Sequence, residues 1–299
     1  MIVKFSGMLD LPADFRPEDI LEFHRRDRSG MAERVQDRML QKGIAWDGHP
    51  ACLYIRFDKE HAEVALSIDG EPAGLDDQAL LAMAKRMLGL TQPIAAFEEA
   101  HRAHPQLGRL IERQQGLRVA LTATPFEALA WAITGQQISV TAAVSLRRKL
   151  IEAVKLRHSS GIFCHPDASA IAVLTESELS RAGYSKTKAL TLSTLSRLAE
   201  NGELPLNAWL TGAPPVDEIR ERLSTIRGIG LWTINYALLR GYGWLDGSLH
   251  GDAGVRRGLQ RLLALPDKIT EDQARHWLTP FAPWRALVAA HLWACSAEN

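Results

Sequence analysis

The chain carries, at residues 223–233, the stretch Leu-Ser-Thr-Ile-Arg-Gly-Ile-Gly-Leu-Trp-Thr, from which the rest of the fold can be worked out. Apolar residues recur at helical spacing before the two glycines, and a second helix over residues 231–240 begins directly after them. Two glycines around one apolar residue allow a tight turn that places Ile229 in the core between the helices. The pattern predicts two helices joined by a hairpin at about residues 216–240.

The predicted start of the second helix is suited to binding a phosphate. The first backbone N–H groups of a helix have no partner inside it, and they lie at the positive end of the helix dipole. The groups concerned here belong to Gly228, Ile229, Gly230 and Leu231. Such a helix start can hold a nucleic-acid phosphate without a basic side chain. The alternative is a plain helix–turn–helix corner that uses glycine as a stop. The apolar spacing on both sides of the glycines favours phosphate binding, although the hairpin alone indicates only binding to a nucleic-acid backbone.

The overall composition is that of an ordinary globular protein. The chain has 299 residues, 46% of them hydrophobic and 23% charged, and its formal net charge is +0. A general nucleic-acid coat protein would be far more basic, so any DNA contact must depend on local geometry. The three cysteines form no C-x-x-C pair, which argues against a zinc ribbon or an iron–sulfur loop. No run of ~18 apolar residues and no secretory signal are found, and we expect a cytoplasmic protein.

Two regions of different character follow each other along the chain. Residues 1–86 contain two short β-like runs, 52–57 and 62–68, of which the second alternates at period two, and together they predict a β-hairpin. A polar stretch at 18–41 is helical in character. Residues 87–299 show helical patterns and no strong strand signal. Within them, Thr124-Pro-Phe-Glu127 is a capping box that opens a helix ending at Gly135. We therefore expect an N-terminal mixed α/β domain with a small antiparallel sheet, followed by an all-α domain.

The sequence after the hairpin points to a known family. A glycine-rich loop, Gly-Tyr-Gly-Trp-Leu-Asp-Gly-Ser-Leu-His-Gly-Asp, covers residues 241–252. The hairpin, this loop and its final Asp252 resemble the helix-hairpin-helix (HhH-GPD) DNA glycosylases, in which such a loop ends at an essential aspartate. The Gly-Gln-Gln-Ile-Ser run at 135–139 resembles the G-Q-x-x-S element that faces DNA in this family. Residues 283–285 and 291–293 resemble the C-terminal helix of the bacterial 3-methyladenine DNA glycosylase II enzymes (AlkA).

The resemblance covers most of the chain and implies an α+β fold whose helical core has two lobes. It also implies roles for individual residues. Asp252 would be the catalytic carboxylate. The aromatic residues of the substrate pocket would be Trp232, Tyr236 and Trp293. DNA would be bound by Gln136, Gln137, Gly228, Ile229, Gly230 and Leu231. A monovalent cation could be held by the backbone carbonyls of Ser224, Ile226 and Ile229. In the best-known relative an apolar wedge residue stands in the place of Gln137, which leaves the identity of the wedge open.

The implied chemistry is excision of an alkylated purine. Cleaving an N-glycosidic bond builds positive charge on the sugar, which a single carboxylate can stabilise. A purine alkylated at a ring nitrogen is already cationic and leaves readily, so Asp252 needs no strong acid partner. Family members that also nick the strand carry a lysine where this chain has Trp232. We therefore expect base excision without lyase activity. Asp252 can equally be read as a helix N-cap, and the two roles are compatible.

The expected partner is double-stranded DNA containing damaged bases, bound by a monomer in the cytoplasm and, when on DNA, associated with the nucleoid. No cofactor and no membrane association are expected. Three other interpretations remain open. The chain could be a glycosylase for oxidised or mismatched bases, a DNA-binding module without chemistry, or a helical protein unconnected with nucleic acid, which its near-zero net charge would suit.

Overall fold

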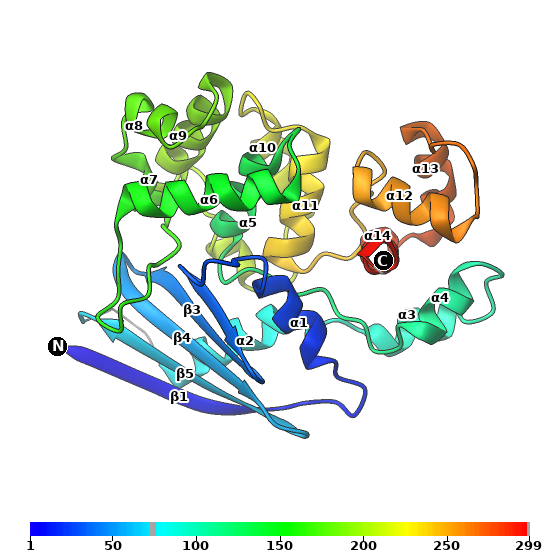
Figure 1. Ribbon diagram of the computed structural model, residues 1–299, viewed down its shortest axis with the longest axis horizontal. Helices are drawn as coiled ribbons and strands as arrows, with labels where there is room; N and C mark the ends of the chain where they lie inside the picture. The colour runs from blue at the N-terminus through cyan, green and yellow to red at the C-terminus, as the bar shows by residue number, and fades with distance from the viewer. Residues whose placement is uncertain (72–75, 298–299) are drawn as a thin grey trace.

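The computed structural model describes residues 1–71 and 76–297 and shows a five-stranded antiparallel sheet beside a larger group of helices (Figure 1). The strand order is β1-β5-β4-β3-β2. Alternate residues of β5 are buried, and each strand after β2 pairs with the strand that precedes it in the chain. The predicted hairpin is formed by β4 and β5. The strands are β1 Ile2–Asp10, β2 Glu33–Gln36, β3 Met39–Trp46, β4 His49–Phe57 and β5 His61–Asp69.

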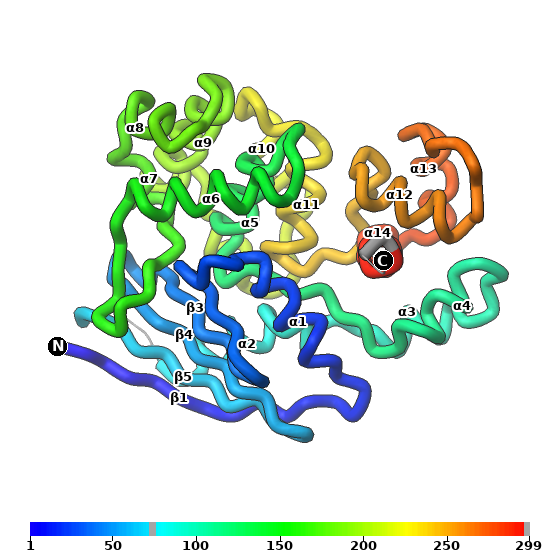
Figure 2. The backbone as a smooth tube through the Cα atoms, viewed as in Figure 1, coloured from blue at the N-terminus to red at the C-terminus, as the bar shows by residue number. Residues whose placement is uncertain are grey.

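Most of the helices lie beside the sheet and extend away from it (Figures 1 and 2). Those that precede the hairpin are α1 Pro17–His24, α2 Asp77–Met87, α3 Ile94–His101, α4 Leu107–Arg113, α5 Pro125–Gly135, α6 Val140–Val154, α7 Ala168–Ala172, α8 Glu176–Arg181 and α9 Lys186–Glu200. Those that follow are the 3-10 turn η1 Ala208–Leu210, α10 Val216–Ser224, α11 Leu231–Tyr242, α12 Ala253–Leu262, α13 Glu271–Leu278, the 3-10 turn η2 Thr279–Phe281 and α14 Arg285–Ala297. No helix in the described ranges is long and apolar enough to cross a bilayer.

The expectation of helical character for residues 18–41 is wrong beyond α1. The chain leaves the helix at His24 and forms β2 and the first three residues of β3 instead. Leu40 and Ile44 are buried, and between them Lys42 is fully buried because carboxylates surround it. A buried lysine hides the apolar pattern of a strand, and the strand exists only because β3 pairs with β4. The local sequence carried no signal for that pairing.

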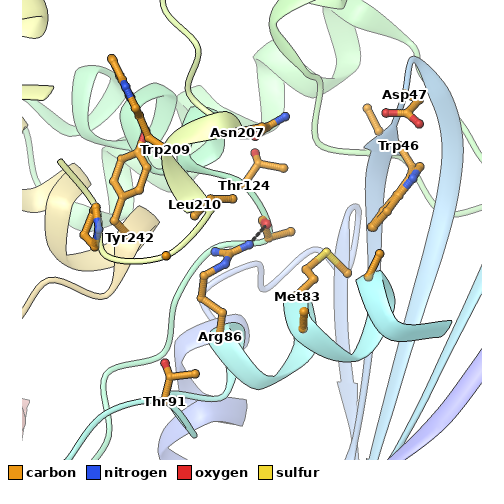
Figure 3. A pocket seen from close by; sticks show the side chains of 16 residues that line it. Trp46, Asp47, Met83, Arg86, Thr91, Thr124, Asn207, Trp209, Leu210 and Tyr242 are labelled. Carbon is orange, nitrogen blue, oxygen red and sulfur yellow. Dashed lines mark hydrogen bonds between the residues drawn. The ribbon is translucent and has the colours of Figure 1, made fainter. Parts of the chain in front are cut away.

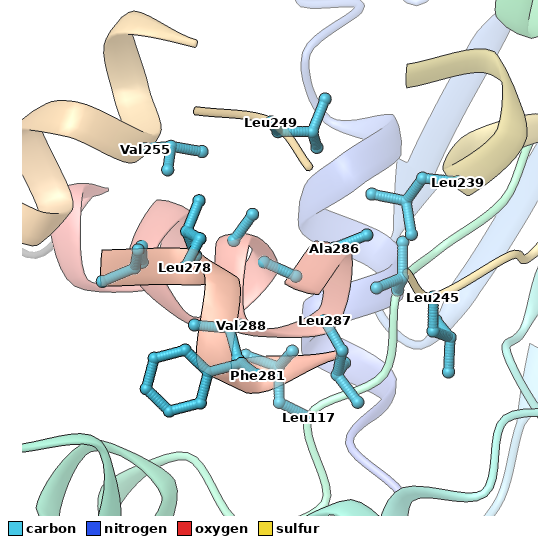
Figure 4. Packing of buried hydrophobic residues seen from close by; sticks show 14 of the residues in the cluster. Leu117, Leu239, Leu245, Leu249, Val255, Leu278, Phe281, Ala286, Leu287 and Val288 are labelled. Carbon is cyan, nitrogen blue, oxygen red and sulfur yellow. The ribbon is translucent and has the colours of Figure 1, made fainter. Parts of the chain in front are cut away.

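The helical part has two hydrophobic cores that share helices α5 and α11. One core joins α3 and α4 to α12, α13 and α14, and Figure 4 shows Leu249, Val255, Leu278 and Leu287 meeting within it. The other core joins α5 and α6 to the helices α7 to α10. Helix α11 supplies residues to both, including Leu239 to the first and Leu238 to the second. This arrangement confirms the predicted α+β fold with a two-lobed helical core.

A buried ionic cluster joins the sheet to the helices. Lys42 on β3 donates hydrogen bonds to Glu33 and, at 2.6 Å, to Glu127 on α5, and Arg147 on α6 bonds both carboxylates. Thr124 accepts the N–H of Glu127 as predicted, but the Glu127 carboxylate bonds Lys42 and the N–H of Ala123, so the expected capping box is half formed. Our predicted domain boundary at residues 86–87 falls in the last turn of α2, and it stays a prediction.

Candidate active site

The hairpin between α10 and α11 has the conformation that the two glycines allow. Gly228 has φ +94°, and a Cβ atom there would lie 2.2 Å from the Oγ1 atom of Thr191 on α9. Ile229 is 6% exposed and packs into the second core, as predicted. Its N–H donates to the carbonyl of Ile226, so this group is occupied by the turn itself. Among the described residues, no backbone acceptor is found for the N–H groups of Gly228, Gly230 or Leu231.

The break between α5 and α6 lies beside the hairpin. The Nε2 atom of Gln136 donates to the carbonyl of Gly228 and to Oγ1 of Thr233, both at 2.9 Å. Gln136 therefore fastens the end of α5 to the start of α11. Gln137 is exposed and has φ +57°, and the next side chain, Ile138, is 40% exposed. Of the two glutamines, only Gln137 is free to reach a ligand with its whole side chain.

The hairpin carbonyls can be compared with the predicted cation site. The carbonyl of Ile226 accepts the N–H of Ile229 and keeps one lone pair. Within the described residues, no backbone donor of the turn reaches the carbonyls of Ser224 or Ile229. Three carbonyl groups with spare acceptor capacity suit a hard monovalent cation, so the residues fit the predicted group. The cation itself stays a prediction.

The glycine-rich loop that follows α11 is anchored at several points. Asp246 accepts two hydrogen bonds from the guanidinium of Arg285 at the start of α14, of 2.7 and 2.9 Å, and this pairing raises the pKa of Arg285. Asn235 on α11 donates to the carbonyl of Ser248 at 2.9 Å. Asp246 therefore has a structural role, and the anchored loop delivers Asp252 to a defined place at the start of α12.

Both oxygens of Asp252 are held by donors. Oδ1 accepts the N–H groups of Gly254 and Val255, at 2.8 and 3.0 Å, which makes Asp252 the N-cap of α12. Oδ1 also accepts the indole N–H of Trp293 at 2.9 Å, and Oδ2 accepts the indole N–H of Trp232 at 3.0 Å. A carboxylate oxygen ordinarily accepts about two hydrogen bonds, and Oδ1 accepts three here whereas Oδ2 accepts one. Oδ2 therefore keeps one position for a further contact.

Close packing of two helices brings Trp293 to the carboxylate. A Cβ atom on Gly258 of α12 would lie 2.1 Å from the carbonyl of Leu292 on α14, so these helices touch backbone to backbone. A Cβ atom on Gly254 would lie 3.0 Å from both Oδ1 of Asp252 and Cδ1 of Trp293. Glycine at these two positions lets the C-terminal helix place its tryptophan against Asp252.

The three predicted pocket aromatics lie together around Asp252 but differ in exposure. The rings of Trp232 and Tyr236 are 5.3 Å apart, and those of Tyr236 and Trp293 are 6.3 Å apart. Tyr236 is 5% exposed and belongs to the first core. Arg240 lies behind them, 5.2 Å from the centre of the Trp293 ring, and burial lowers its pKa to about 10. Trp232 is the one of the three that lines the groove described next.

A groove of about 990 Å³ runs past Asp252 and the hairpin. The predicted site residues that line it are Asp252, Trp232, Gln136, Gln137, Gly228 and Gly230. The N-caps of four helices also line it: Ser139 of α6, Ser185 of α9, Gly230 of α11 and Asp252 of α12. The three ends with uncharged caps bring partial positive charge to the groove, which favours anions, whereas the Asp252 carboxylate makes the end of α12 negative. A chain of zero net charge can in this way bind a phosphate backbone.

The groove also contains charged residues that were not among the predicted site residues. Lys188 donates to the carbonyl of Thr134 at 2.8 Å, and burial lowers its pKa. Arg256 lies 3.8 Å from Glu271, a second carboxylate near the site, contributed by the start of α13. The Ser185-x-x-Lys188 cap was a readable signal for the start of α9. Nothing in the local sequence connects Glu271 to Asp252.

Comparison with known proteins places these features in context. The family model described as HhH-GPD superfamily base excision DNA repair protein matches residues 130–283. A DNA-3-methyladenine glycosylase of Bacillus subtilis is 28% identical over 207 residues, which are 68% of this chain and 68% of that protein. A solved structure described as 3-methyladenine DNA-glycosylase from Archaeoglobus fulgidus has a TM-score of 0.80 at 21% identity, covering 98% of this chain and 99% of the other.

A third similarity concerns a complex with DNA. The Clostridium acetobutylicum 8-oxoguanine glycosylase/lyase, solved with double-stranded DNA containing cytosine opposite 8-oxoG, has a TM-score of 0.74 at 16% identity. The match covers 100% of this chain and 98% of the other. At this identity the likeness concerns the fold alone, and the fold is shared by proteins named for different bases.

Proposed function

Since this chain belongs to the HhH-GPD superfamily of base excision DNA repair proteins, we propose that it is a monofunctional DNA glycosylase for alkylated purines. Its substrates would be bases of the 3-methyladenine and 7-methylguanine type, flipped out of duplex DNA. The observation that carries the proposal is Asp252, held by two indole N–H groups in a groove that four helix starts surround. The similarity to the Bacillus subtilis DNA-3-methyladenine glycosylase supports this choice of substrate.

The carboxylate would act on the sugar. As the glycosidic bond breaks, positive charge develops at the anomeric carbon, and a fixed carboxylate stabilises it without reorganising. The two indole donors and the cap of α12 hold Asp252 in one orientation. The remaining acceptor position on Oδ2 can face the sugar or orient the attacking water. One carboxylate is sufficient, because an alkylated purine departs as a neutral base.

The groove would hold the DNA and the flipped nucleotide. The target atom is inaccessible in a stacked duplex, so the nucleotide must leave the helix. Phosphates would lie against the free N–H groups of the hairpin and the other helix starts. Exposed Gln137 would enter the space left by the base. The electron-rich face of Trp232 suits a cationic purine through stacking and cation–π contact.

The absence of strand cleavage is proposed from the identity of residue 232. A lyase needs an amine that attacks the sugar carbon and forms a Schiff base. Trp232 presents an indole N–H, which donates to Asp252 and cannot act as a nucleophile. The expected products are therefore a free base and an intact abasic strand.

The test is incubation of the protein and its Asp252→Asn variant with alkylated duplex DNA, with released bases and strand nicks measured separately. The asparagine would keep Oδ1 as the cap of α12 and lose the negative charge. We expect excision at least about 100-fold slower, with duplex binding by fluorescence anisotropy nearly unchanged. Asp217→Asn, on the fully exposed side of α10, is the matched control and should excise normally. Equal loss of binding and excision in Asp252→Asn would assign a structural role to Asp252.

The identity of the released base decides between this proposal and its nearest rival. Release of methylated purines supports it. Release of an oxidised or mismatched base, with no methylated purine, would assign the other specificity to the same site. Strand nicks appearing together with base release would overturn the proposed lack of lyase activity.

A further inference from the structure

A second cavity, of about 490 Å³, lies at the junction of the sheet and the helices. It is enclosed by the β3–β4 turn, α2, the start of α5, the end of α11 and the segment around η1. Its volume is in the range of small-molecule sites. None of the residues of the candidate active site lines it.

The walls of this cavity are largely aromatic and apolar. Figure 3 shows Trp46 and Met83 on one side and Trp209 and Tyr242 on the other. Met83, Trp209 and Tyr242 are each no more than 7% exposed, so the walls are set by the packing of the fold. Aromatic side chains on both sides of the cavity suit a planar apolar body within it.

One cation, Arg86, projects from α2 into the space between these walls (Figure 3). It donates to the carbonyls of Thr122, Ala123 and Gly241, at 3.0, 2.5 and 3.1 Å. A guanidinium has five N–H groups, so two remain after these three contacts. No carboxylate of the described residues lies within ion-pair distance of Arg86. Asp47, the acidic residue that lines the cavity, is exposed in the β3–β4 turn.

The electrostatics of Arg86 favour an anion. Burial lowers the pKa of Arg86 to about 10, with smaller opposing effects of Glu127 and Tyr242, so the side chain stays charged at neutral pH. A half-buried cation whose hydrogen-bond partners among the described residues are all backbone carbonyls is stabilised when a carboxylate accepts its remaining N–H groups. Arginine is suited to this because its planar fork matches a carboxylate in geometry.

We propose that this cavity is a binding site for a small aromatic carboxylate, whose anionic group contacts Arg86 and whose ring lies between Trp46 and the Trp209–Tyr242 wall. The site is separate from the proposed glycosylase chemistry, and its occupancy does not depend on it.

The position of the cavity connects it to the DNA groove. The carbonyls that bind Arg86 lie just before α5 and at the end of α11. The other ends of these two helices carry Gln137 and Trp232 in the groove. A ligand that draws Arg86 towards itself would thus act on both helices at the ends opposite the groove. For α11, the distance between that end and the end in the groove is one helix length, about 18 Å.

The experiment measures binding of naphthoate to the wild-type protein by isothermal titration calorimetry, with naphthylmethanol as the neutral analogue of the same shape. We expect one naphthoate per chain, bound at least about ten-fold more tightly than the alcohol, as for a charged hydrogen-bonded pair. Arg86→Met should remove this preference. Lys85→Met, the exposed neighbour on the same helix, should keep it.

A second variant guards against misfolding of Arg86→Met. Ala82 lines the cavity and is exposed, so Ala82→Trp should fill the space without disturbing the core, and naphthoate binding should be lost. Equal affinity for naphthoate and the alcohol, or naphthoate binding that persists in both Arg86→Met and Ala82→Trp, would overturn the proposal. Because the readout is binding, these outcomes are distinguishable from failure of base excision.

Discussion

The indole N–H of Trp293 donates a 2.9 Å hydrogen bond to Oδ1 of Asp252, across 41 residues of sequence. The C-terminal helix thereby fixes the orientation of the carboxylate that we propose as catalytic. Trp232 makes the equivalent contact with Oδ2 from the hairpin side. Both indole donors pack against the first core, so the geometry of this carboxylate depends on how α11, α12 and α14 pack together there.

Trp293→Phe should slow excision by about ten-fold while duplex binding is unchanged. Phenylalanine keeps a ring in the same place but removes the donor, and a hydrogen bond to a charged group contributes about 1.5–3 kcal/mol. Single-turnover release of methylated base measures the effect. Trp277→Phe is the control, because Trp277 packs against the same core away from Asp252. Its ring centre lies 4.7 Å from that of Phe281. An equal slowing in both variants would contradict a specific role of the Trp293 donor.

The two adjacent glutamines should behave differently when each is replaced by alanine. Gln136→Ala loses two hydrogen bonds to the hairpin and should lower the free energy of unfolding by about 1–2 kcal/mol. Gln137→Ala should change it by less than about 0.5 kcal/mol, since Gln137 is exposed. Gln137→Ala should nevertheless reduce excision from duplex DNA. Urea unfolding and excision assays on both variants test this, and normal excision by Gln137→Ala would remove Gln137 from the DNA contacts.

Gly228→Ala should damage the hairpin beyond the cost of its backbone angle. The new methyl group would collide with Oγ1 of Thr191, whereas Gly202, with φ +76°, has nothing within 4 Å. Gly202→Ala therefore measures the strain of positive φ alone, about 1 kcal/mol. We expect Gly228→Ala to cost more stability than this control and to weaken duplex binding.

A double variant tests whether the cost of Gly228→Ala comes from the collision of its new methyl group with Thr191. Thr191→Ala removes Oγ1, so Gly228→Ala combined with Thr191→Ala should recover part of the lost stability. Denaturant unfolding of the single and double variants gives the coupling between the two positions. Simple additivity would show that Thr191 does not limit residue 228.

Stability should fall as the pH is lowered from neutral. Burial lowers the pKa of His165 to about 4 and that of His291 to about 3. Between the ordinary histidine value and these values the unfolded chain binds protons that the folded chain excludes, so unfolding is favoured by acid. His165 alone contributes about 3 kcal/mol to the free energy of unfolding. This contribution is fully present above pH ~6.5 and is lost as the pH falls towards ~4.

Glu127 extends the same trend to lower pH. Burial raises its pKa, but Lys42, His165 and Arg147 outweigh burial and lower it to about 2. The stabilisation that ionised Glu127 contributes is present above pH ~4.5 and is lost as the pH falls towards ~2. Urea unfolding at a series of pH values should show a shallower decline between pH ~6.5 and ~4 for His165→Gln. Exposed His276→Gln is the control, and an unchanged slope in His165→Gln would contradict the argument.

Much of the fold was readable from local patterns. The Gly-x-Gly turn, the Thr124 cap, the end of α5 and the strand pair β4–β5 are all where the sequence places them. These features depend on backbone angles, caps and alternation within a few residues. The pairing of β3 with β4 was missed because Lys42 interrupts the apolar alternation of β3. The burial of this lysine is explained only by its contacts with Glu33 and Glu127.

The sequence by itself determined the hairpin, the glycine-rich loop and the position of Asp252 at a helix start, since each is specified by residues close together in the chain. Only the tertiary structure decided which donors hold that carboxylate, that four helix N-caps line one groove, and that Glu271 lies near it. These relationships arise when α11, α12 and α14 pack together. Contacts between distant residues leave no periodic trace in the sequence, because packing, and not spacing, brings them together.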